Sequence, residues 1–504
     1  MPDATRKLLA VDLGAESGRA ILGAFDGRRI ALSEVHRFPN TPVPLPDGLH
    51  WDALNLWSEI RKALGLALQS TGGELAGIGL DTWGVDFGLL DKHGVLLGNP
   101  YHYRDARTDG MMEAVFNRVQ RADVFAQTGI QFMQLNTLYQ LFAMVTRSEP
   151  TLAAAETFLT MPDLLNYWLT GRKVCEFTNA TTTQCFDTRR MTWARPLLQR
   201  LGIPDRIFPE VVLPGTVLGS LRGQVAEEVG AKGTLPVIAP ACHDTGSAVA
   251  AVPASGEDFV WISSGTWSIM GVNAREPVIN EQTLACEMTN EGGVDRTFRL
   301  SKNIMGLWPV QESRRTWARE GHSYSYDELT RMAAEAEPLR SLINPDHDDF
   351  LKPGDMPARV RAYCQRTGQP VPETPGQVVR ACLEGVALKY RWVLERLERL
   401  QGSPSAPRRL DTIHIVGGGT KNKLLSQLTA DATQRQVITG PVEATATGNL
   451  LVQALALGEI SSLEEAREVV RSSFDVQVFE PDTTTCQAWN DAYARMLALM
   501  GESC

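Results

Sequence analysis

The sequence predicts an α/β protein built from two domains of related architecture with a cleft between them. The chain has 504 residues, about three times the length of a typical domain, so it has room for several hydrophobic cores. Short apolar strands alternate with longer helical patterns along most of it, which is typical of α/β layers with largely parallel sheets. A strand that ends in a small, polar turn occurs near the N-terminus and again half a chain later.

Five short apolar segments, each followed by a turn, are the expected strands. They lie at residues 8–12, 76–80, 235–239, 259–263 and 412–416. The clearest helix is expected over residues 376–400, because apolar side chains recur there at three- and four-residue steps. This periodicity predicts a helix packed against a core.

The half-chain repeat predicts the domain organisation. One strand runs into the turn 12–19 and the other into the turn 263–268. The small-residue segment 248–256 separates two strand-rich regions, so we place the domain boundary there. We therefore expect an N-terminal domain over residues 1–247 and a C-terminal domain over residues 248–504. Chance similarity between two turns is the alternative interpretation.

Composition and charge argue against several classes of function. Lys and Arg total 49 and Asp and Glu total 59, which gives a formal net charge of −10. Nucleic acids and anionic membranes attract an excess of basic residues, so neither is an expected partner. No apolar run approaches the roughly 18 residues that span a bilayer, and the N-terminal residues lack the apolar stretch of a signal peptide. We therefore expect a cytoplasmic protein.

Cysteine and histidine spacing indicates no dedicated metal cage. The eight cysteines include no C-x-x-C pair, and the eight histidines show no H-E-x-x-H spacing. The acidic run 346–349 is more typical of a solvated loop than of a metal site. Unpaired cysteines suit a reducing compartment.

Two turns are candidate phosphate-binding loops, because glycine lets backbone amides approach an anion. In the turn 12–19, Ser17 offers a hydroxyl, Arg19 offers positive charge, and Asp12 at the strand tip is suited to hold Mg²⁺ through water. The alternative is a simple hairpin with a type I′ or II′ turn. The turn 263–268 adds further hydroxyls, and two facing loops would grip a polyphosphate from both sides.

A third glycine turn, residues 417–419, follows a predicted strand and precedes an expected helix over residues 423–433. The helix N-terminus would then face negative charge on a nucleotide. The turn matches neither the dinucleotide-binding nor the Walker motif. A purely structural strand-to-helix turn is the alternative.

Asp244 is the candidate catalytic base. Phosphoryl transfer needs one carboxylate that orients the attacking hydroxyl and takes its proton, and Asp244 follows a predicted strand and precedes a small-residue helix. The alternative is that Asp244 only caps this helix. His243 beside it would either contact a ligand or pack in the turn.

Two further segments have the composition of a polyol site. Residues 81–87 combine aromatic rings, carboxylates and a glycine, so a ring would pack on the C–H surface while acids accept hydroxyl protons. An alternating strand is the alternative there. Within residues 302–308, Asn303 would bond a hydroxyl or cap a helix.

Taken together, these segments resemble the FGGY family of carbohydrate kinases. The resemblance covers about residues 8–460, and its most specific parts are DTWGVDF at 81–87, TNATTTQ at 178–184 and KNIMGLW at 302–308. It implies two actin-like, ribonuclease-H-like domains around a central cleft that holds MgATP and a ketose. The family members most similar to it phosphorylate the C1 hydroxyl of L-rhamnulose. Another ketose, such as L-fuculose or xylulose, is the nearest alternative, and an actin-like ATPase without a polyol pocket is an alternative from another class.

The resemblance also implies roles for individual residues, with Asp244 as the base and Asp12 carrying magnesium, usually through water. The sugar would contact Trp83, Gly84, His243, Asp244, Thr245 and Asn303. ATP would contact Ala15, Glu16, Ser17, Gly18, Arg19, Thr266, Gln311, Gly417, Gly418 and Gly419. Glu16 departs from the family pattern, which has a small polar residue there, and its carboxylate would repel a polyphosphate. The expected partners are the sugar and ATP, in a monomer or small homo-oligomer.

Overall fold

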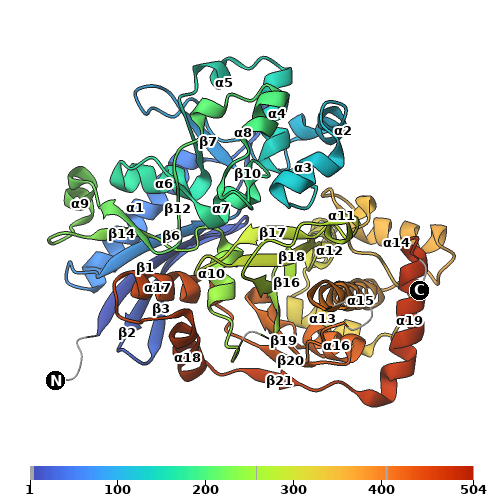
Figure 1. Ribbon diagram of the computed structural model, residues 1–504. Helices are drawn as coiled ribbons and strands as arrows, with labels where there is room; N and C mark the ends of the chain where they lie inside the picture. Colours follow the sequence, from blue (N-terminus) through green and yellow to red (C-terminus); the bar gives the residue numbers. More distant parts are fainter. Residues whose placement is uncertain (1–4, 257, 403–406, 503–504) are drawn as a thin grey trace. The chain divides into compact units, whose positions relative to one another are not determined.

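The computed structural model describes residues 5–256, 258–402 and 407–502 (Figure 1). Cys504 lies outside these residues. The chain divides into two compact units, each assembled from three stretches of sequence. Unit 1 comprises Met1–Ser255, Asn273–Leu300 and Ala444–Phe474, and unit 2 comprises Gly256–Val272, Ser301–Glu443 and Asp475–Cys504.

Unit 1 contains a large sheet, several two-stranded ribbons and the helices around them. Its strands are β1 (Arg6–Leu13), β2 (Ser17–Phe25), β3 (Ile30–Pro39), β4 (Val43–Leu45), β5 (Gly48–His50), β6 (Gly77–Thr82), β7 (Phe87–Leu90), β8 (Thr157–Thr160), β9 (Cys175–Glu176), β10 (Phe186–Asp187), β11 (Thr192–Trp193), β12 (Val211–Val212), β13 (Thr216–Ser220), β14 (Pro236–Ala239) and β17 (Thr289–Gly292). Its helices are α1 (Ala53–Ser70), α2 (Met111–Phe116), α3 (Arg121–Thr128), α4 (Thr137–Thr146), α5 (Pro150–Ala154), α6 (Met161–Thr170), α7 (Phe177–Thr182), α8 (Arg195–Leu201), α9 (Gly223–Val229), α10 (Asp244–Ala250), α11 (Glu281–Ala285), α17 (Ala444–Ala456) and α18 (Leu463–Ser473).

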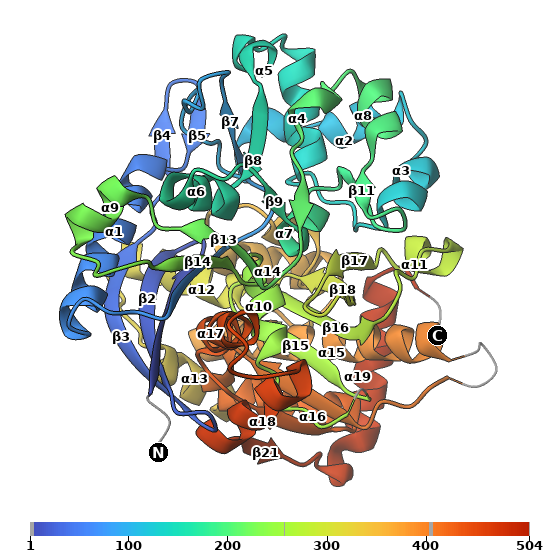
Figure 2. The same cartoon turned by 60° about the vertical axis from the view of Figure 1, so that its left-hand side comes forward.

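The large sheet of unit 1 has six strands in the order β13-β14-β6-β1-β2-β3. Strands β1, β2 and β3 pair antiparallel through tight turns, whereas β6 lies parallel to β1 and β14 parallel to β6. Figure 2 shows β2 and β3 side by side. Helices α1 and α6 cover one face and α17 covers the other (Figure 1). The sheet is therefore mixed, and the expectation of largely parallel sheets is wrong, because short hairpin turns can only join antiparallel neighbours.

Strand β1 has buried residues on both of its faces, which suits its place inside this sheet. Leu9, Val11 and Leu13 point into the core formed with α1 and α6, and the intervening residues face α17. Every residue from Leu8 to Leu13 is buried, as expected for a strand covered on both faces. Asp12 thus lies near the end of a strand that is buried from Leu8 onward.

Unit 2 holds the second sheet and the longest helix. Its strands are β15 (Val260–Ser264), β16 (Ser268–Ala274), β18 (Phe298–Ile304), β19 (Thr412–Val416), β20 (Gln436–Thr439) and β21 (Gln477–Phe479), of which β16 and β18 run on into the stretches of unit 1. Its helices are α12 (Trp308–Arg319), α13 (Tyr326–Glu335), α14 (Met356–Arg366), α15 (Pro375–Gln401), α16 (Lys423–Thr433) and α19 (Cys486–Leu499).

The same strand order occurs in both units, which confirms the repeat. Unit 1 shows β3-β2-β1-β6-β14 and unit 2 shows β18-β16-β15-β19-β20. In each case the third, second and first strands come before the fourth and fifth, and the first strand lies parallel to the fourth. The protein is therefore an α/β protein with two ribonuclease-H-like, actin-like units.

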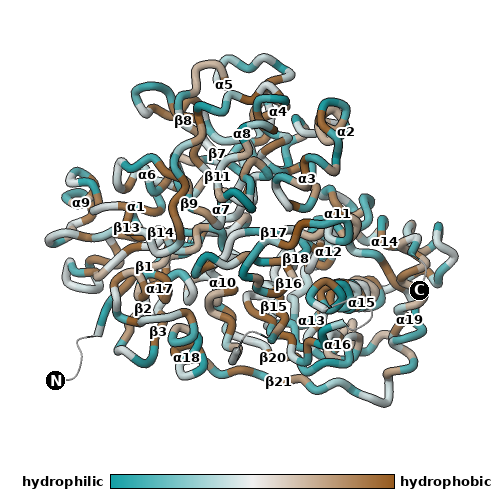
Figure 3. The backbone as a smooth tube through the Cα atoms, in the orientation of Figure 1, coloured by the Kyte–Doolittle hydropathy of each residue, from teal (hydrophilic) through white to brown (hydrophobic). Residues whose placement is uncertain are grey.

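The expected secondary structure is confirmed at each of the five strands and at the long helix. The strands correspond to β1, β6, β14, β15 and β19, and the helix corresponds to α15. Helix α15 begins with a capping box at Thr374 and Gln377, which satisfies two backbone amides of its first turn. Figure 3 shows both hydrophobic and hydrophilic segments around α15, and its apolar residues are buried. Within the described ranges, no helix has the length and apolar character needed to cross a bilayer.

Helices α10 and α17 approach so closely that a glycine is required at their contact. A Cβ atom on Gly448 would lie 1.8 Å from the backbone oxygen of Ser247. We expect Gly448→Ala to lower the free energy of unfolding by about 1–3 kcal/mol or more, because overpacking forces backbone shifts. Urea denaturation measures this change.

Gly65 in α1 provides the matched control, since a Cβ atom there meets nothing within 4 Å. Gly65→Ala should raise the free energy of unfolding by about 0.5–1 kcal/mol, because alanine restricts the unfolded chain. Equal effects of the two substitutions would contradict the close packing of α10 on α17.

Candidate active site

Three carboxylates lie at the ends of three neighbouring parallel strands in unit 1. Asp12 in β1 is the register partner of Asp81 in β6, and Asp244 follows β14, which pairs with β6. We call these three residues the carboxylate cluster. Parallel strands bring their carboxyl ends to one edge of a sheet, which is where α/β proteins bind ligands. The sheet order therefore assembles the cluster from residues far apart in sequence.

Each carboxylate of the cluster keeps one oxygen that receives no hydrogen bond from the described residues. Arg19 donates twice to Asp12 Oδ2, from Nε at 2.9 Å and Nη2 at 2.7 Å. Asn449 donates to Asp81 Oδ2 at 2.5 Å, whereas Asp81 Oδ1 is buried without a partner. The open oxygens are Asp12 Oδ1, Asp81 Oδ1 and Asp244 Oδ2.

The cluster is electrostatically unfavourable by itself. Desolvation raises the pKa of Asp81 well above its ordinary value, and the charges of Asp12 and Asp244 raise it further. Desolvation also raises the pKa of Asp244, His243 lowers it, and Asp12 raises it. A cation at this edge of the sheet would offset the repulsion. Among the described residues, no group of three or more His, Cys, Asp or Glu side chains is arranged to hold a metal ion directly.

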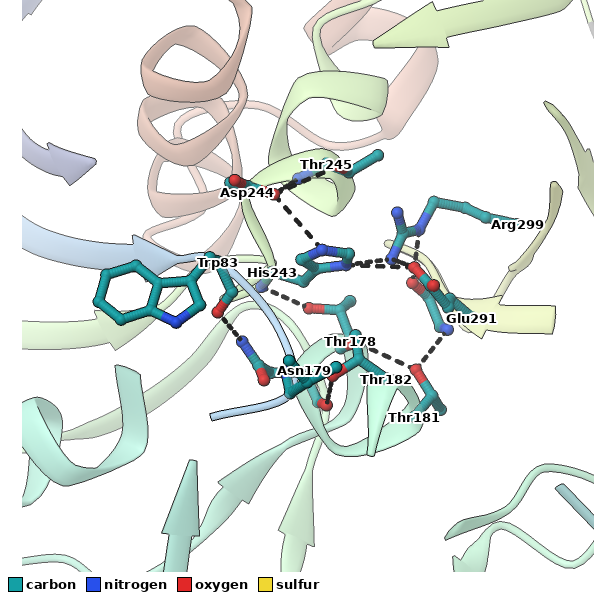
Figure 4. A network of polar contacts seen from close by, with 12 residues as sticks. Trp83, Thr178, Asn179, Thr181, Thr182, His243, Asp244, Thr245, Glu291 and Arg299 are labelled. Carbon is teal, nitrogen blue, oxygen red and sulfur yellow. Dashed lines mark hydrogen bonds and ion pairs between the residues drawn. The ribbon is translucent and has the colours of Figure 1, made fainter. Parts of the chain in front are cut away.

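The carboxylate of Asp244 is held through one oxygen. Its Oδ1 accepts hydrogen bonds from the backbone N of Thr245 at 2.5 Å and from Thr245 Oγ1 at 3.2 Å, and His243 Nε2 lies 3.4 Å away (Figure 4). His243 occupies the N-cap of α10, and Asp244 is the first helical residue. The interpretation of Asp244 as the helix cap is therefore wrong. Its Oδ2 is left for a hydroxyl donor.

The predicted sugar residues Trp83 and Gly84 lie in a turn packed on α7. Strand β6 ends at Thr82, and Val85 has a positive φ of 69°, so the alternative of an unbroken alternating strand is wrong. Asn179 Nδ2 donates to the Trp83 backbone oxygen at 3.3 Å (Figure 4). Gly84 lies so close to α7 that a Cβ atom would come within 3.0–3.1 Å of Thr182.

Asp86 in the same segment binds the protein itself. Its Oδ2 accepts from the indole nitrogens of Trp51 at 2.6 Å and Trp83 at 3.0 Å and from the backbone N of Tyr103, and its Oδ1 accepts from Gln140. Burial raises the pKa of Asp86 to about 6. The expectation that the acids of this segment accept hydroxyl protons from a polyol is therefore wrong for Asp86, which orients two tryptophans instead.

The first candidate phosphate loop is the hairpin between β1 and β2. Neither Ala15 nor Glu16 has a positive φ, so the expected type I′ or II′ turn is wrong. Gly14 N donates to Ser17 O at 3.0 Å, which closes the turn over Ala15 and Glu16. Glu16 is exposed at the tip. Gly18 is required for packing, because a Cβ atom there would lie 2.3 Å from the Phe38 ring.

The second candidate phosphate loop, between β15 and β16 in unit 2, is joined to the start of α12. Leu307 N donates to Gly265 O and Trp308 N donates to Thr266 O, both at 3.1 Å. Gln311 follows in the first turn of α12, and its Oε1 is buried without a partner among the described residues. The structure thus brings Thr266 and Gln311 to one place. Asn303 lies in β18 of the same unit.

The three glycines after β19 have different surroundings. Gly417 has a positive φ of 89°, and a Cβ atom on Gly419 would lie within 2.1 Å of Ser264 Oγ. A Cβ atom on Gly418 would meet nothing within 4 Å, and this residue is exposed. Two of the glycines are therefore needed for backbone conformation and packing, whereas Gly418 presents open backbone suited to a ligand.

Sequence reasoning missed three buried charged residues behind the site. Glu176 accepts from the backbone N of Thr178, Asn179 and Cys242, and Thr178 Oγ1 in turn accepts from His243 N at 3.0 Å. Burial raises the pKa of Glu176 to about 7. The other two, Glu291 and Arg299, lie beside the His243 ring (Figure 4). The available signal was a charged residue inside a run of apolar and small residues, as at 174–186.

The protein has two ribonuclease-H-like units, with carboxylates and glycine turns at strand ends. This combination places it in the class of actin-like phosphotransferases. The model of the FGGY family of carbohydrate kinases, N-terminal domain, matches residues 7–251, and the model of the C-terminal domain matches residues 260–457. The chain belongs to the FGGY family of carbohydrate kinases.

Curated relatives share this similarity over nearly their whole length. A rhamnulokinase of Bacteroides thetaiotaomicron is 45% identical over 97% of this chain and 98% of its own. Rhamnulokinases of Halalkalibacterium halodurans and Oceanobacillus iheyensis are 42% and 40% identical, over 93% and 94% of this chain and 97% of their own.

Solved structures share the fold. A gluconate kinase from Lactobacillus acidophilus has a TM-score of 0.80 at 16% identity, covering 99% of this chain and 98% of its own. A ligand-bound xylulose kinase from the same organism has a TM-score of 0.80 at 15% identity, covering 98% of each chain. These likenesses are evidence for the fold alone.

Proposed function

We propose that this protein transfers the γ-phosphoryl group of ATP to the C1 hydroxyl of L-rhamnulose, giving L-rhamnulose 1-phosphate and ADP. The observation that carries the proposal is the 45% identity to a curated rhamnulokinase over 97% of the chain. The arrangement of the carboxylate cluster supports it, because phosphoryl transfer needs a base beside a site for cations.

In this proposal Asp244 takes the proton of the attacking hydroxyl. Its Oδ1 is already occupied by Thr245, so Oδ2 would accept the proton while the helix start keeps the carboxylate oriented. The raised pKa of Asp244 suits this role, because a stronger base accepts the proton more readily. The remaining proposed sugar contacts are Trp83, Gly84, His243, Thr245 and Asn303.

Unit 2 is proposed to supply ATP contacts at Thr266, Gln311 and the glycines 417–419, and unit 1 at the hairpin 15–19. The open backbone at Gly418 supports this assignment, since close approach to a nucleotide needs space without a side chain. Glu16 is exposed at the hairpin tip, where its carboxylate has room to point away from phosphate.

Mg²⁺ fits the residues present. No described residue donates to Asp12 Oδ1, and the neighbouring Asp81 adds negative charge. Asp12 would hold the ion, mainly through water, and Arg19 would keep the other Asp12 oxygen in place. The bound ion supplies positive charge to the phosphate oxygens during transfer.

The proposal also covers the location, the oligomeric state and the domain roles of the protein. We propose a cytoplasmic enzyme that acts as a monomer or small homo-oligomer on a small sugar and ATP. Its N-terminal domain, residues 1–247, would supply the sugar site and first phosphate loop, and residues 248–504 would supply most nucleotide contacts.

A coupled ADP-release assay over a panel of polyols tests the function. L-Rhamnulose should give the highest kcat/KM, L-fuculose and D-xylulose should be clearly poorer, and glycerol should be nearly inert. Groups that hydrogen-bond to sugar hydroxyls discriminate strongly between sugars, because an unpaired buried polar group is costly. Apolar contacts with the C6 methyl discriminate weakly.

Two outcomes of this panel would contradict the proposal. A clear preference for D-xylulose or glycerol would reject L-rhamnulose as the substrate while leaving the kinase family intact. The absence of sugar-stimulated ADP release with every polyol would reject the sugar kinase activity itself.

A further inference from the structure

Two oppositely charged residues are buried behind the His243 ring. Glu291 lies in β17 and Arg299 in β18, and their side chains are 5% and 0% exposed. Burying an ion pair costs about as much desolvation energy as the attraction returns, so such a pair is weak evidence for a role in stability. The placement of this pair against a residue next to the candidate base suggests a functional role.

Arg299 is held in a fixed orientation. Its Nε donates to the backbone oxygen of Gly292 at 2.8 Å, and its Nη2 lies 3.0 Å from Glu291 Oε2. Gly292 N in turn donates to Thr181 Oγ1 at 2.8 Å, which ties β17 to α7 (Figure 4). The guanidinium therefore reaches His243 from a rigid support.

The contacts of the His243 ring favour one neutral tautomer. Arg299 Nη2 lies 2.9 Å from His243 Nδ1 in a hydrogen bond, and Glu291 Oε2 lies 3.2 Å from the same nitrogen. A guanidinium has donors and no acceptor, so Nδ1 must present its lone pair to Arg299. In a neutral ring the proton then sits on Nε2, which faces Asp244 Oδ1 at 3.4 Å.

We propose that Arg299, balanced by Glu291, is a positioning residue for phosphoryl transfer, which fixes His243 as the Nε2–H tautomer so that the ring donates to Asp244 Oδ1. This inference rests on the proposed function of Asp244. Thr245 already donates twice to Oδ1. A proton on Nε2, which lies 3.4 Å from the same oxygen, would add a third donor there and leave Oδ2 for the sugar hydroxyl. The 3.4 Å contact is expected to shorten when substrate binds.

The role of Glu291 in this arrangement is to balance charge. Burial acts to raise the pKa of Glu291, but the Arg299 guanidinium beside it holds the pKa below its ordinary value. Glu291 is therefore ionised and neutralises the fully buried guanidinium. The opposite tautomer, with the proton on Nδ1 and donated to Glu291, would turn the Nε2 lone pair toward the Asp244 carboxylate and repel it.

Nitrogen NMR of the ligand-free, ¹⁵N-histidine-labelled full chain tests the tautomer directly, with His243→Gln used to assign the signal. The expected result is an unprotonated Nδ1 and a protonated Nε2 on His243. A proton on Nδ1 in the unaltered protein would overturn the inference. This measurement needs no substrate, and His243→Gln is needed only as a folded reference for the assignment, so the result decides the tautomer whatever the kinase assay shows.

A matched pair of variants tests the consequence for catalysis. Arg299→Met and Glu291→Gln disrupt the same ion pair. Only Arg299→Met removes the donor to Nδ1, because Glu291→Gln leaves Arg299 in place and its glutamine amide can also donate. We expect Arg299→Met to protonate Nδ1 and lower kcat at least tenfold, while Glu291→Gln keeps Nδ1 unprotonated and kcat within about threefold. Arg299→Lys, which retains a donor, should restore much of kcat.

Equal losses of kcat in the two variants would overturn the inference, because a purely structural ion pair predicts equal effects. Circular dichroism and thermal unfolding show whether each variant is folded. A failure of the proposed function is distinguishable, since the unaltered protein would then fail to phosphorylate L-rhamnulose although its His243 signal carries the expected proton.

Discussion

Asp244→Asn is expected to lower kcat by about 100-fold or more while ATP and sugar still bind. An asparagine oxygen can still accept from the backbone N of Thr245, as Asp244 Oδ1 does at 2.5 Å. The amide nitrogen that replaces Oδ2 cannot accept a proton from the sugar hydroxyl. Steady-state ADP release gives kcat, and calorimetry with each ligand shows that binding persists.

The pH dependence of the unaltered enzyme provides a second test of Asp244 as the base. Because desolvation raises the pKa of Asp244, the base is lost by protonation at a higher pH than for an exposed aspartate. kcat/KM should therefore be full above this raised pKa and fall as the pH drops through it. The acid limb should disappear in Asp244→Asn.

Asp52 supplies a matched control for this substitution. It caps α1 by accepting from Asn55 N, and asparagine caps a helix as well as aspartate does. Asp52→Asn should leave kcat unchanged. Near-normal kcat in Asp244→Asn would show that Asp244 only shapes the start of α10.

Gly418→Val should raise the KM for ATP at least tenfold, which corresponds to about 1.4 kcal/mol of binding energy, and leave the KM for the sugar nearly unchanged. A Cβ atom at Gly418 meets nothing within 4 Å, so the fold has room for the side chain. The β-branched group would instead occupy the space proposed for the nucleotide. Initial rates with either substrate varied separate the two KM values.

Substitutions at Gly223 and Gly419 provide two comparisons for this result. Gly223 begins α9, is exposed and has nothing within 4 Å of its Cβ position, so Gly223→Val should leave both KM values unchanged. Gly419→Ala should lower the melting temperature, because its Cβ would overlap Ser264. Equal weakening of ATP and sugar in Gly418→Val, or melting of this variant, would assign the triple glycine a structural role only.

Local sequence patterns were sufficient for the elements that carry the site. The predicted strands at 412–416 and 8–12 are β19 and most of β1, and the predicted helix at 376–400 is α15. Apolar runs followed by turn residues determine such elements, because the spacing of apolar residues sets which side chains a strand or helix buries. The repeat of the strand-turn pattern also predicted two related units, which the shared strand order confirms.

Strand direction and carboxylate function depended on tertiary packing. Whether a strand lies parallel or antiparallel to its neighbour depends on which strand it meets after the connection, and hairpins made both sheets mixed. The segment 81–87 contains two aspartates of similar sequence context. Only the fold gave Asp86 four hydrogen-bond donors and left Asp81 Oδ1 without a donor in the part of the chain that the structure describes.

By itself the sequence determined the fold class, the glycine turns, the candidate base and the resemblance to carbohydrate kinases, because these follow from residue order and spacing. Only the tertiary structure decided which charges meet. Asp12, Asp81 and Asp244 come together through the strand order, and Glu291 and Arg299 reach His243 through strands that follow it by about fifty residues. Electrostatic interaction depends on distance and desolvation in space, and neither quantity is encoded in the separation of residues along the chain.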